Sequence, residues 1–121
     1  MKKFISAMLV AAMAVTALTG CGSNSGSSSK KDADKYYIGG IGPTTGATAI
    51  YGTAVKNGAQ IAVDEINAAG GINGKQIEYR FEDDQNDAEK AVNAYNTLKD
   101  WGMQMLVGTT TTAPCIAVAG K

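Results

Sequence analysis

The stretch Met105-Leu-Val-Gly-Thr-Thr-Thr-Thr-Ala-Pro114 decides the fold, because a short apolar run there breaks into a glycine and four consecutive threonines. The apolar residues predict a buried strand that ends at Gly108. The threonines, Thr109–Thr112, then fall where the chain turns toward a helix expected to begin near Ala113–Pro114. The end of a strand followed by the start of a helix is the place where open α/β sheets bind ligands.

Two interpretations of the threonine run compete at this point. Hydroxyl groups of Thr110, Thr111 and Thr112 both donate and accept hydrogen bonds, and a helix start adds unpaired N–H groups. This combination suits a carboxylate or a zwitterion better than a metal. The alternative is an ordinary strand-to-helix turn in which threonine caps the helix. The run alone favours the ordinary turn, so the rest of the chain has to decide between them.

The chain before this stretch alternates between strand patterns and helix patterns. Strands are predicted at 35–42, 76–82 and 103–107, and helices at 49–69, from 88 to about 101, and after the threonines. Polar and apolar residues alternate in 76–82, which indicates a half-buried strand near a sheet edge. The order β-α-β-α-β-α predicts an α/β fold with a parallel sheet and right-handed crossovers.

Two local features refine the predicted helices. The first helix carries an apolar stripe at helical spacing, and its small residues would let it lie close to a sheet. The stripe consists of Val55, Gly58, Ala59, Ala62 and Ile66. Before the second helix, Asn86 and Glu89 have the spacing of a capping box.

Residues 1–20 have the three parts of a secretory signal: Lys2 and Lys3, an apolar run, and small residues before Cys21. Leu18-Thr-Gly-Cys21 resembles the bacterial lipobox, in which the cysteine is lipidated and becomes the new N-terminus. Residues 21–34 are rich in glycine and serine and then charged, which predicts a flexible tether. Residues 35–121 form the folded part. We therefore expect an exported protein anchored by lipid at the cell membrane, on its extracytoplasmic face.

Composition excludes several classes of function. Eleven basic residues balance eleven acidic ones, and no basic patch with interleaved aromatics is present, so nucleic acid is not an expected partner. The chain has no histidine to activate a nucleophile, so we expect no enzyme. With Cys21 lipidated, Cys115 is expected to be buried or to pair with a cysteine beyond Lys121. No cofactor is expected.

Two other motifs come close to the patterns of nucleotide-binding and calcium-binding sites, but each has a simpler structural explanation. The glycines of Gly40-x-Gly42-x-x-x-Gly46 miss the spacing of the dinucleotide fingerprint, and Pro43 stiffens the loop. The acidic residues from Glu82 to Asp87 lack the glycine and the distal glutamate of a calcium loop. An exposed loop leading into a helix start is the favoured interpretation of this acidic run.

Tyr51 lies at the start of the first helix. Because parallel strands end at the same edge of a sheet, Tyr51 and Thr110–Thr112 are expected to face one cavity. An aromatic face beside hydroxyl groups suits an apolar side chain with a polar head. The alternative is a half-exposed aromatic at a helix start.

Several segments resemble the branched-chain amino acid binding proteins of bacterial ABC importers. Ile41-Gly-Pro-Thr-Thr-Gly46 with Tyr51-Gly52 is similar to the opening loop of that family. Asp64-Glu-Ile-Asn-Ala-Ala-Gly-Gly-Ile-Asn-Gly74 is similar to its most specific segment. Glu82-Asp-Asp84 and Val107-Gly108 fit as well.

The resemblance implies a type I periplasmic binding protein with two Rossmann-like lobes that close on a solute. This chain would supply the start of lobe one, as the first part of a longer protein. Tyr51 would line the pocket, Thr112 or its neighbour Thr111 would bind the ligand's head group, and the complex would be presented to an ABC permease in the membrane. The expected function is binding of branched-chain or related amino acids. The alternatives are the ligand-sensing domain of a receptor, or a truncated fragment without function.

Overall fold

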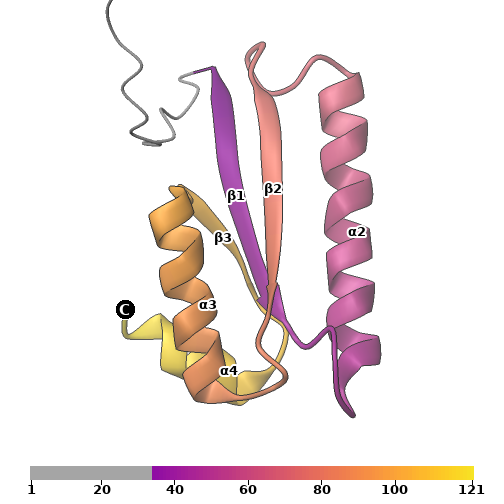
Figure 1. Cartoon of the computed structure of the whole chain (residues 1–121). Helices are drawn as coiled ribbons and strands as arrows, with labels where there is room; N and C mark the ends of the chain where they lie inside the picture. Colours follow the sequence, from indigo (N-terminus) through magenta and orange to yellow (C-terminus); the bar gives the residue numbers. More distant parts are fainter. Residues whose placement is uncertain (1–33) are drawn as a thin grey trace, which may run out of the picture. The chain divides into compact units, whose positions relative to one another are not determined.

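The computed structural model describes residues 34–121, in which strands and helices alternate along the chain (Figure 1). The elements are β1 (Lys35–Gly42), α2 (Ala49–Ala68), β2 (Gln76–Asp83), α3 (Ala88–Trp101), β3 (Met105–Thr109) and α4 (Thr112–Ala119). The predicted signal, the lipidation site at Cys21 and the tether up to residue 33 lie outside the described residues. Within 34–121, no helix combines the length and the apolar character that crossing a bilayer requires.

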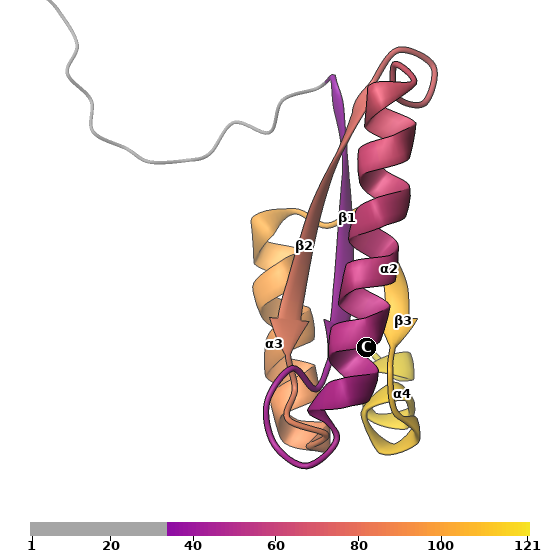
Figure 2. The ribbon, with the colours of Figure 1, turned by 90° about the vertical axis from the view of Figure 1, so that its right-hand side faces the viewer.

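The three strands form one parallel sheet in the order β2-β1-β3, which confirms the predicted α/β class. The most central strand, β1, pairs with β2 along its whole length, from Lys35 opposite Gln76 to Gly42 opposite Asp83. Helix α2 lies on one face of the sheet, and α3 with α4 lies on the other (Figures 1 and 2). The strand 76–83 is a half-buried edge strand, as its alternation predicts.

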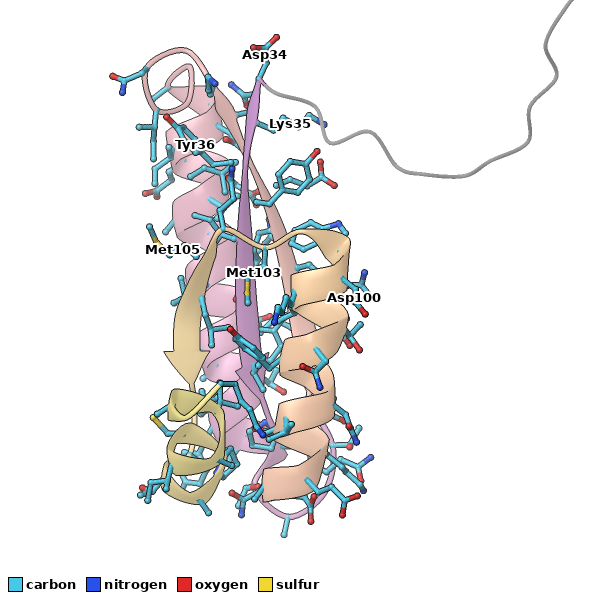
Figure 3. All side chains as sticks on the ribbon, turned by 90° about the vertical axis from the view of Figure 1, so that its left-hand side faces the viewer. Asp34, Lys35, Tyr36, Asp100, Met103 and Met105 are labelled. Atoms are coloured by element: carbon cyan, nitrogen blue, oxygen red, sulfur yellow. The ribbon has the colours of Figure 1, made fainter. Side chains whose placement is uncertain are left out.

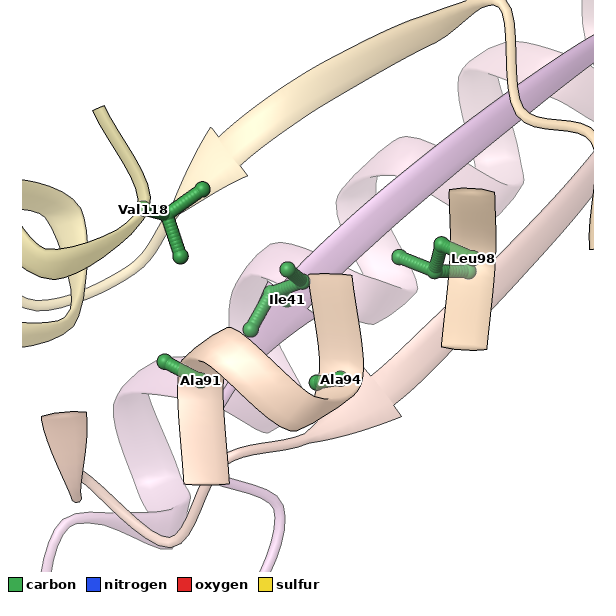
Figure 4. Close-up of a cluster of buried hydrophobic side chains, with 5 residues drawn as sticks. All are labelled: Ile41, Ala91, Ala94, Leu98 and Val118. Carbon is green, nitrogen blue, oxygen red and sulfur yellow. The ribbon is translucent and has the colours of Figure 1, made fainter. Parts of the chain in front are cut away.

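The hydrophobic core lies between β1 and the α3–α4 side (Figure 4). Its buried members are Ile41, Ala91, Ala94, Leu98 and Val118. A Cβ on the β1 glycine at position 39 would lie 2.9 Å from a methyl carbon of Leu98, so the missing side chain lets α3 pack closely. Full burial of a leucine side chain contributes roughly 2 to 3 kcal/mol.

The apolar stripe predicted for α2 is not the face that packs on the sheet. Val55 and Ile66 are 39% and 36% exposed, and Gly58 and Ala62 are exposed as well. The buried residues of the helix are instead Gly52 and Val63, on the neighbouring stripe.

The side chain of Asn67 explains this rotation of α2. Its Nδ2 donates to the carbonyl oxygen of Ile77 at 2.8 Å, and its Oδ1 accepts from the N–H of Ile77 at 2.7 Å. These two bonds tie the end of α2 to the backbone of β2. A stripe defined by apolar residues alone does not contain this polar contact.

The third strand begins at Met105 and ends at Thr109, so the predicted bounds of 103–107 were two residues early. Gln104 binds both backbone groups of Tyr37. Its N–H donates to the Tyr37 carbonyl at 2.9 Å, and its Oε1 accepts from the Tyr37 N–H at 3.0 Å. Regular pairing starts only after this contact. Figure 3 shows Met103, before the strand, directed between β1 and α3.

Gly108 does not end β3, as the sequence predicted, but lies inside it. The register shifts between Gly40 and Ile41, so that Val107 pairs with Gly40 and Thr109 with Ile41. Gly108 is the extra residue, with φ of 51°, in the left-handed region that glycine adopts without strain. The bulge therefore lets the strand continue to Thr109.

The cap of α3 is Asp87, not Asn86 as predicted. The Asp87 side chain accepts from the N–H of Lys90 at 2.9 Å, and its backbone is extended, as an N-cap requires. Asn86 has φ of 60° and belongs to the preceding turn. The helix ends at Gly102 in the left-handed conformation, close to the predicted end.

Candidate functional site

An open hollow of roughly 600 Å³ lies where the carboxyl ends of β1 and β3 lead into α2 and α4. One wall comes from the first two turns of α2 and the other from the threonine run. The lining residues are Ile50, Tyr51, Ala54, Val55, Thr110, Thr111 and Thr112. The structure therefore brings together the four residues that the sequence placed in one cavity.

The wall from α2 is positioned by the loop before it. The N–H of Ala49 donates to the carbonyl of Gly46, and the N–H of Tyr51 to that of Thr48. A Cβ at Gly52 would overlap the carbonyl of the buried Pro43, so only glycine lets the first turn of α2 rest on this loop. Tyr51 is 63% exposed beside the hollow.

The threonines of the other wall differ in how their hydroxyl groups are used. Thr110 donates from its N–H and its Oγ1 to the carbonyl of Ile41, at 3.1 and 3.3 Å. Thr111 Oγ1 is buried and has no hydrogen-bond partner among the described residues. Thr112 is exposed as the first residue of α4. Thr111 is thus the lining threonine with an unused buried hydroxyl.

Helix α4 begins at Thr112, with Thr111 as N-cap, one residue before the predicted start. The Thr111 side chain makes no capping bond, so the first N–H groups of the helix stay available. Helix N-termini favour anions, because these N–H groups carry partial positive charge. No ionisable side chain except the tyrosine phenol lines the hollow. An apolar wall therefore faces hydrogen-bond donors across a neutral space.

Thr109 is a residue that the sequence did not single out. Its Oγ1 is also buried without a hydrogen-bond partner in the described part of the chain. Thr109 does not line the hollow. Its position at the last pair of β3, opposite Ile41, follows from the bulge at Gly108, which strand periodicity does not predict.

The acidic run after β2 is not simply an exposed loop, because Asp84 is completely buried. Burial raises the pKa of Asp84, and its Oδ2 has no hydrogen-bond partner among residues 34–121. Asp83 binds the loop before α2, and Asp87 caps α3. In the described residues, no three acidic, cysteine or histidine residues gather in a way that could hold a metal ion.

Two features lie apart from the hollow. A second hollow of roughly 280 Å³ is found at the amino ends of β1 and β3, the end where open α/β sheets do not build ligand sites. Its lining is largely apolar and includes Tyr36, Ile38, Ile72 and Met105. Cys115, expected to be buried or paired, is exposed on α4 and forms no disulfide within the described residues.

Comparisons with known proteins agree with this geometry. The family described as Periplasmic binding protein matches residues 35–121. The chain is 44% identical over 82 residues to the Leu/Ile/Val-binding protein BraC3 of Rhizobium johnstonii, covering 68% of this chain and 22% of that protein. It is 41% identical over 76 residues to the leucine-, isoleucine-, valine-, threonine-, and alanine-binding protein of Pseudomonas aeruginosa, covering 63% and 20%.

A solved structure matches the fold as well. The branched-chain amino acid transporter substrate-binding protein LivJ of Streptococcus pneumoniae, in complex with isoleucine, gives a TM-score of 0.67 at 39% identity. That match covers 71% of this chain and 25% of the solved chain. The chain spans about a fifth of the length of the curated relatives. It belongs to the periplasmic binding protein family, and its parallel sheet with flanking helices is the start of the type I fold of that family.

Proposed function

We propose that this chain is part of an extracytoplasmic solute-binding subunit of an ABC importer for branched-chain or related amino acids. One observation carries the proposal. The hollow at the carboxyl ends of β1 and β3 combines an apolar wall around Tyr51 with the lining threonines and the start of α4. The Rhizobium relative is named a Leu/Ile/Val-binding protein, and the name of the Pseudomonas relative adds threonine and alanine to these three amino acids. Both names support the same class of solute.

Binding in this proposal needs no chemical step, no cofactor and no metal. Tyr51 packs on the apolar side chain of the solute. The first N–H groups of α4 and the hydroxyl of the exposed Thr112 hold its carboxylate, with Thr110 and Thr111 beside them. Thr110 contributes less, because its hydroxyl is already bonded to Ile41.

The membership in a periplasmic binding protein family implies a location outside the cytoplasm. We propose that residues 1–20 are a lipoprotein signal, that Cys21 carries the lipid anchor, and that residues 21–34 tether the lobe that begins at residue 35. The membrane permease would then receive the loaded protein. The intact mass of the protein from the membrane fraction tests the anchor: a mass without lipid at Cys21 would exclude it.

Calorimetry with leucine on the full polypeptide, whatever its length, tests the binding function. Tyr51→Ala should weaken binding by at least tenfold, from the loss of about 1.4 kcal/mol of burial. Ile61→Ala is the matched control, because Ile61 is 59% exposed on the same helix and does not line the hollow. Unchanged affinity in the Tyr51 variant would remove that residue from the site. Failure of the wild-type protein to bind any amino acid would overturn the proposed function.

A further inference from the structure

Asp83, at the carboxyl end of β2, holds the loop that leads into α2. Its Oδ1 accepts from the N–H of Thr44 at 2.8 Å, and its Oδ2 accepts from Thr45 Oγ1 at 2.5 Å. Oδ1 also accepts from the N–H of Gln85 at 3.0 Å, which fixes the carboxylate from its own side of the chain. Three donors from two loops thus converge on one carboxylate.

Both walls of the hollow join β1, and the wall that contains Tyr51 is also bonded to β2. The threonine wall is bonded to β1, through Thr110 and the carbonyl of Ile41. The wall that contains Tyr51 continues from β1 through the loop that Asp83 bonds to β2. Gly52 rests on the carbonyl of Pro43, so the loop and the first turn of α2 move together. The position of Tyr51 relative to the threonines consequently depends on the bonds of Asp83.

We propose that Asp83 is a positioning residue for the solute site. It does not line the hollow itself, and acts by setting the distance between the Tyr51 wall and the threonine wall. Its effect on affinity rests on the proposed function, whereas its effect on the loop does not. An ionised carboxylate suits this role, because all three partners donate hydrogen bonds to it.

Neighbouring acidic residues do not share this arrangement. Glu82 pairs with Arg80 at 2.7 Å. The Asp84 side chain accepts from the N–H of Asn86 at 2.9 Å, and only its backbone N–H reaches back to the carbonyl of Gly42, at 3.3 Å. A substitution at Glu82 therefore provides a control that removes a carboxylate one residue away without touching the loop.

Amide hydrogen exchange of the ligand-free full polypeptide tests directly whether Asp83 holds the loop through its bonds to Thr44 and Thr45. Asp83→Ala should speed exchange in the segment from Thr44 to Gly52 by about tenfold, since the segment loses its tie to β2. Glu82→Ala should leave that segment unchanged, and Thr45→Val, which removes one bond only, should give a smaller increase. Unchanged exchange in this segment of the Asp83 variant would overturn the proposal, whether or not any solute binds.

Leucine affinity then tests whether the bonds of Asp83 to the loop act on binding through the position of Tyr51. Asp83→Ala should weaken binding by about tenfold in the wild-type background and by much less when Tyr51 is already alanine. Asp83→Asn, which keeps an acceptor for Thr44, should restore part of the affinity. A purely structural role would weaken binding equally in both backgrounds, and that result would overturn the proposal. Absence of leucine binding by the wild type would instead refute the proposed function, and exchange would still decide the role of Asp83.

Discussion

Asp83 and Asp84 are neighbours in the sequence, and the fold places their carboxyl groups in opposite environments. Desolvation alone would raise the pKa of Asp83, but hydrogen bonds from Thr45, Thr44 and Gln85 outweigh it and leave this pKa below its usual value. Desolvation raises the pKa of Asp84, and the nearby charge of Asp83 adds to the shift. Ionised Asp83 therefore stabilises the fold fully when the pH is above the pKa of this group in the unfolded chain. That stabilisation is lost as the pH falls through the pKa of Asp83 in the folded chain. Ionised Asp84 destabilises the fold at neutral pH, and acid relieves that destabilisation.

Asp84→Asn should raise the free energy of unfolding at neutral pH by about 1 kcal/mol, because it removes a buried charge whose Oδ2 has no hydrogen-bond partner in the described chain. The gain should shrink as the pH approaches about 3.9, where aspartate protonates in the unfolded chain. Urea unfolding at a series of pH values measures both effects. Asp87→Asn is the control, because asparagine caps a helix as well as aspartate. A loss of stability that is the same at every pH would contradict this account of Asp84.

At the scale of whole elements, α2 and the edge strand β2 depend on each other through one side chain. Asn67 bonds to both the N–H and the carbonyl of Ile77. These are backbone groups of an edge strand, and the side chain satisfies them as another strand would. The contact fixes the rotation of α2 and closes β2 to further pairing at this position.

Asn67→Ala should therefore lower the free energy of unfolding by about 2 kcal/mol, from the loss of two hydrogen bonds to partly buried backbone groups. Asn93→Ala is a suitable comparison, since Asn93 is exposed on α3 and its side chain has no such contact. Denaturant unfolding of both variants gives the difference. Equal stability of the two would show that the Asn67 bonds do not hold α2 in place.

The same contact shows what periodicity predicts at this scale and what it does not. The type and order of all six described elements followed from apolar spacing, glycine positions and helix ends. The stripe around Val55 was wrong, because Asn67 rotates the helix onto a different stripe. The start of β3 was wrong because Gln104 pairs with Tyr37 across 67 residues, a contact that no local pattern contains.

The candidate site was predictable to the same extent. Parallel topology places Tyr51 and the threonines at one edge of the sheet, and they do line one hollow. Which hydroxyl is unused depends on the register of Thr110 against Ile41, and that register depends on a bulge. The bond between Asp83 and Thr44 joins residues 39 positions apart, so the sequence alone indicated only an acidic run.

At the scale of the described chain, the two edges of the sheet differ. The β2 edge is closed at Ile77, and the strand contains Glu78, Arg80 and Glu82. No other strand of the described part pairs with the outer edge of β3, which has no charged residue. Large apolar side chains beside it are exposed, including Met105 at 61% and Val107 at 44%. Edges and apolar surfaces of this kind promote pairing with other chains.

Residues 34–121 expressed alone should therefore associate as the concentration rises, and sedimentation velocity measures this directly. Val107→Lys should lower the associated fraction, because a charge on an edge strand must be desolvated when another strand pairs with it. Thr97→Lys adds the same charge on the exposed surface of α3, a helix that packs on β1 and β2 rather than on β3, and should leave association unchanged. If both lysine variants reduced association equally, net charge would be the cause. A wild-type chain that stayed monomeric at high concentration would mean that the β3 edge does not recruit other chains.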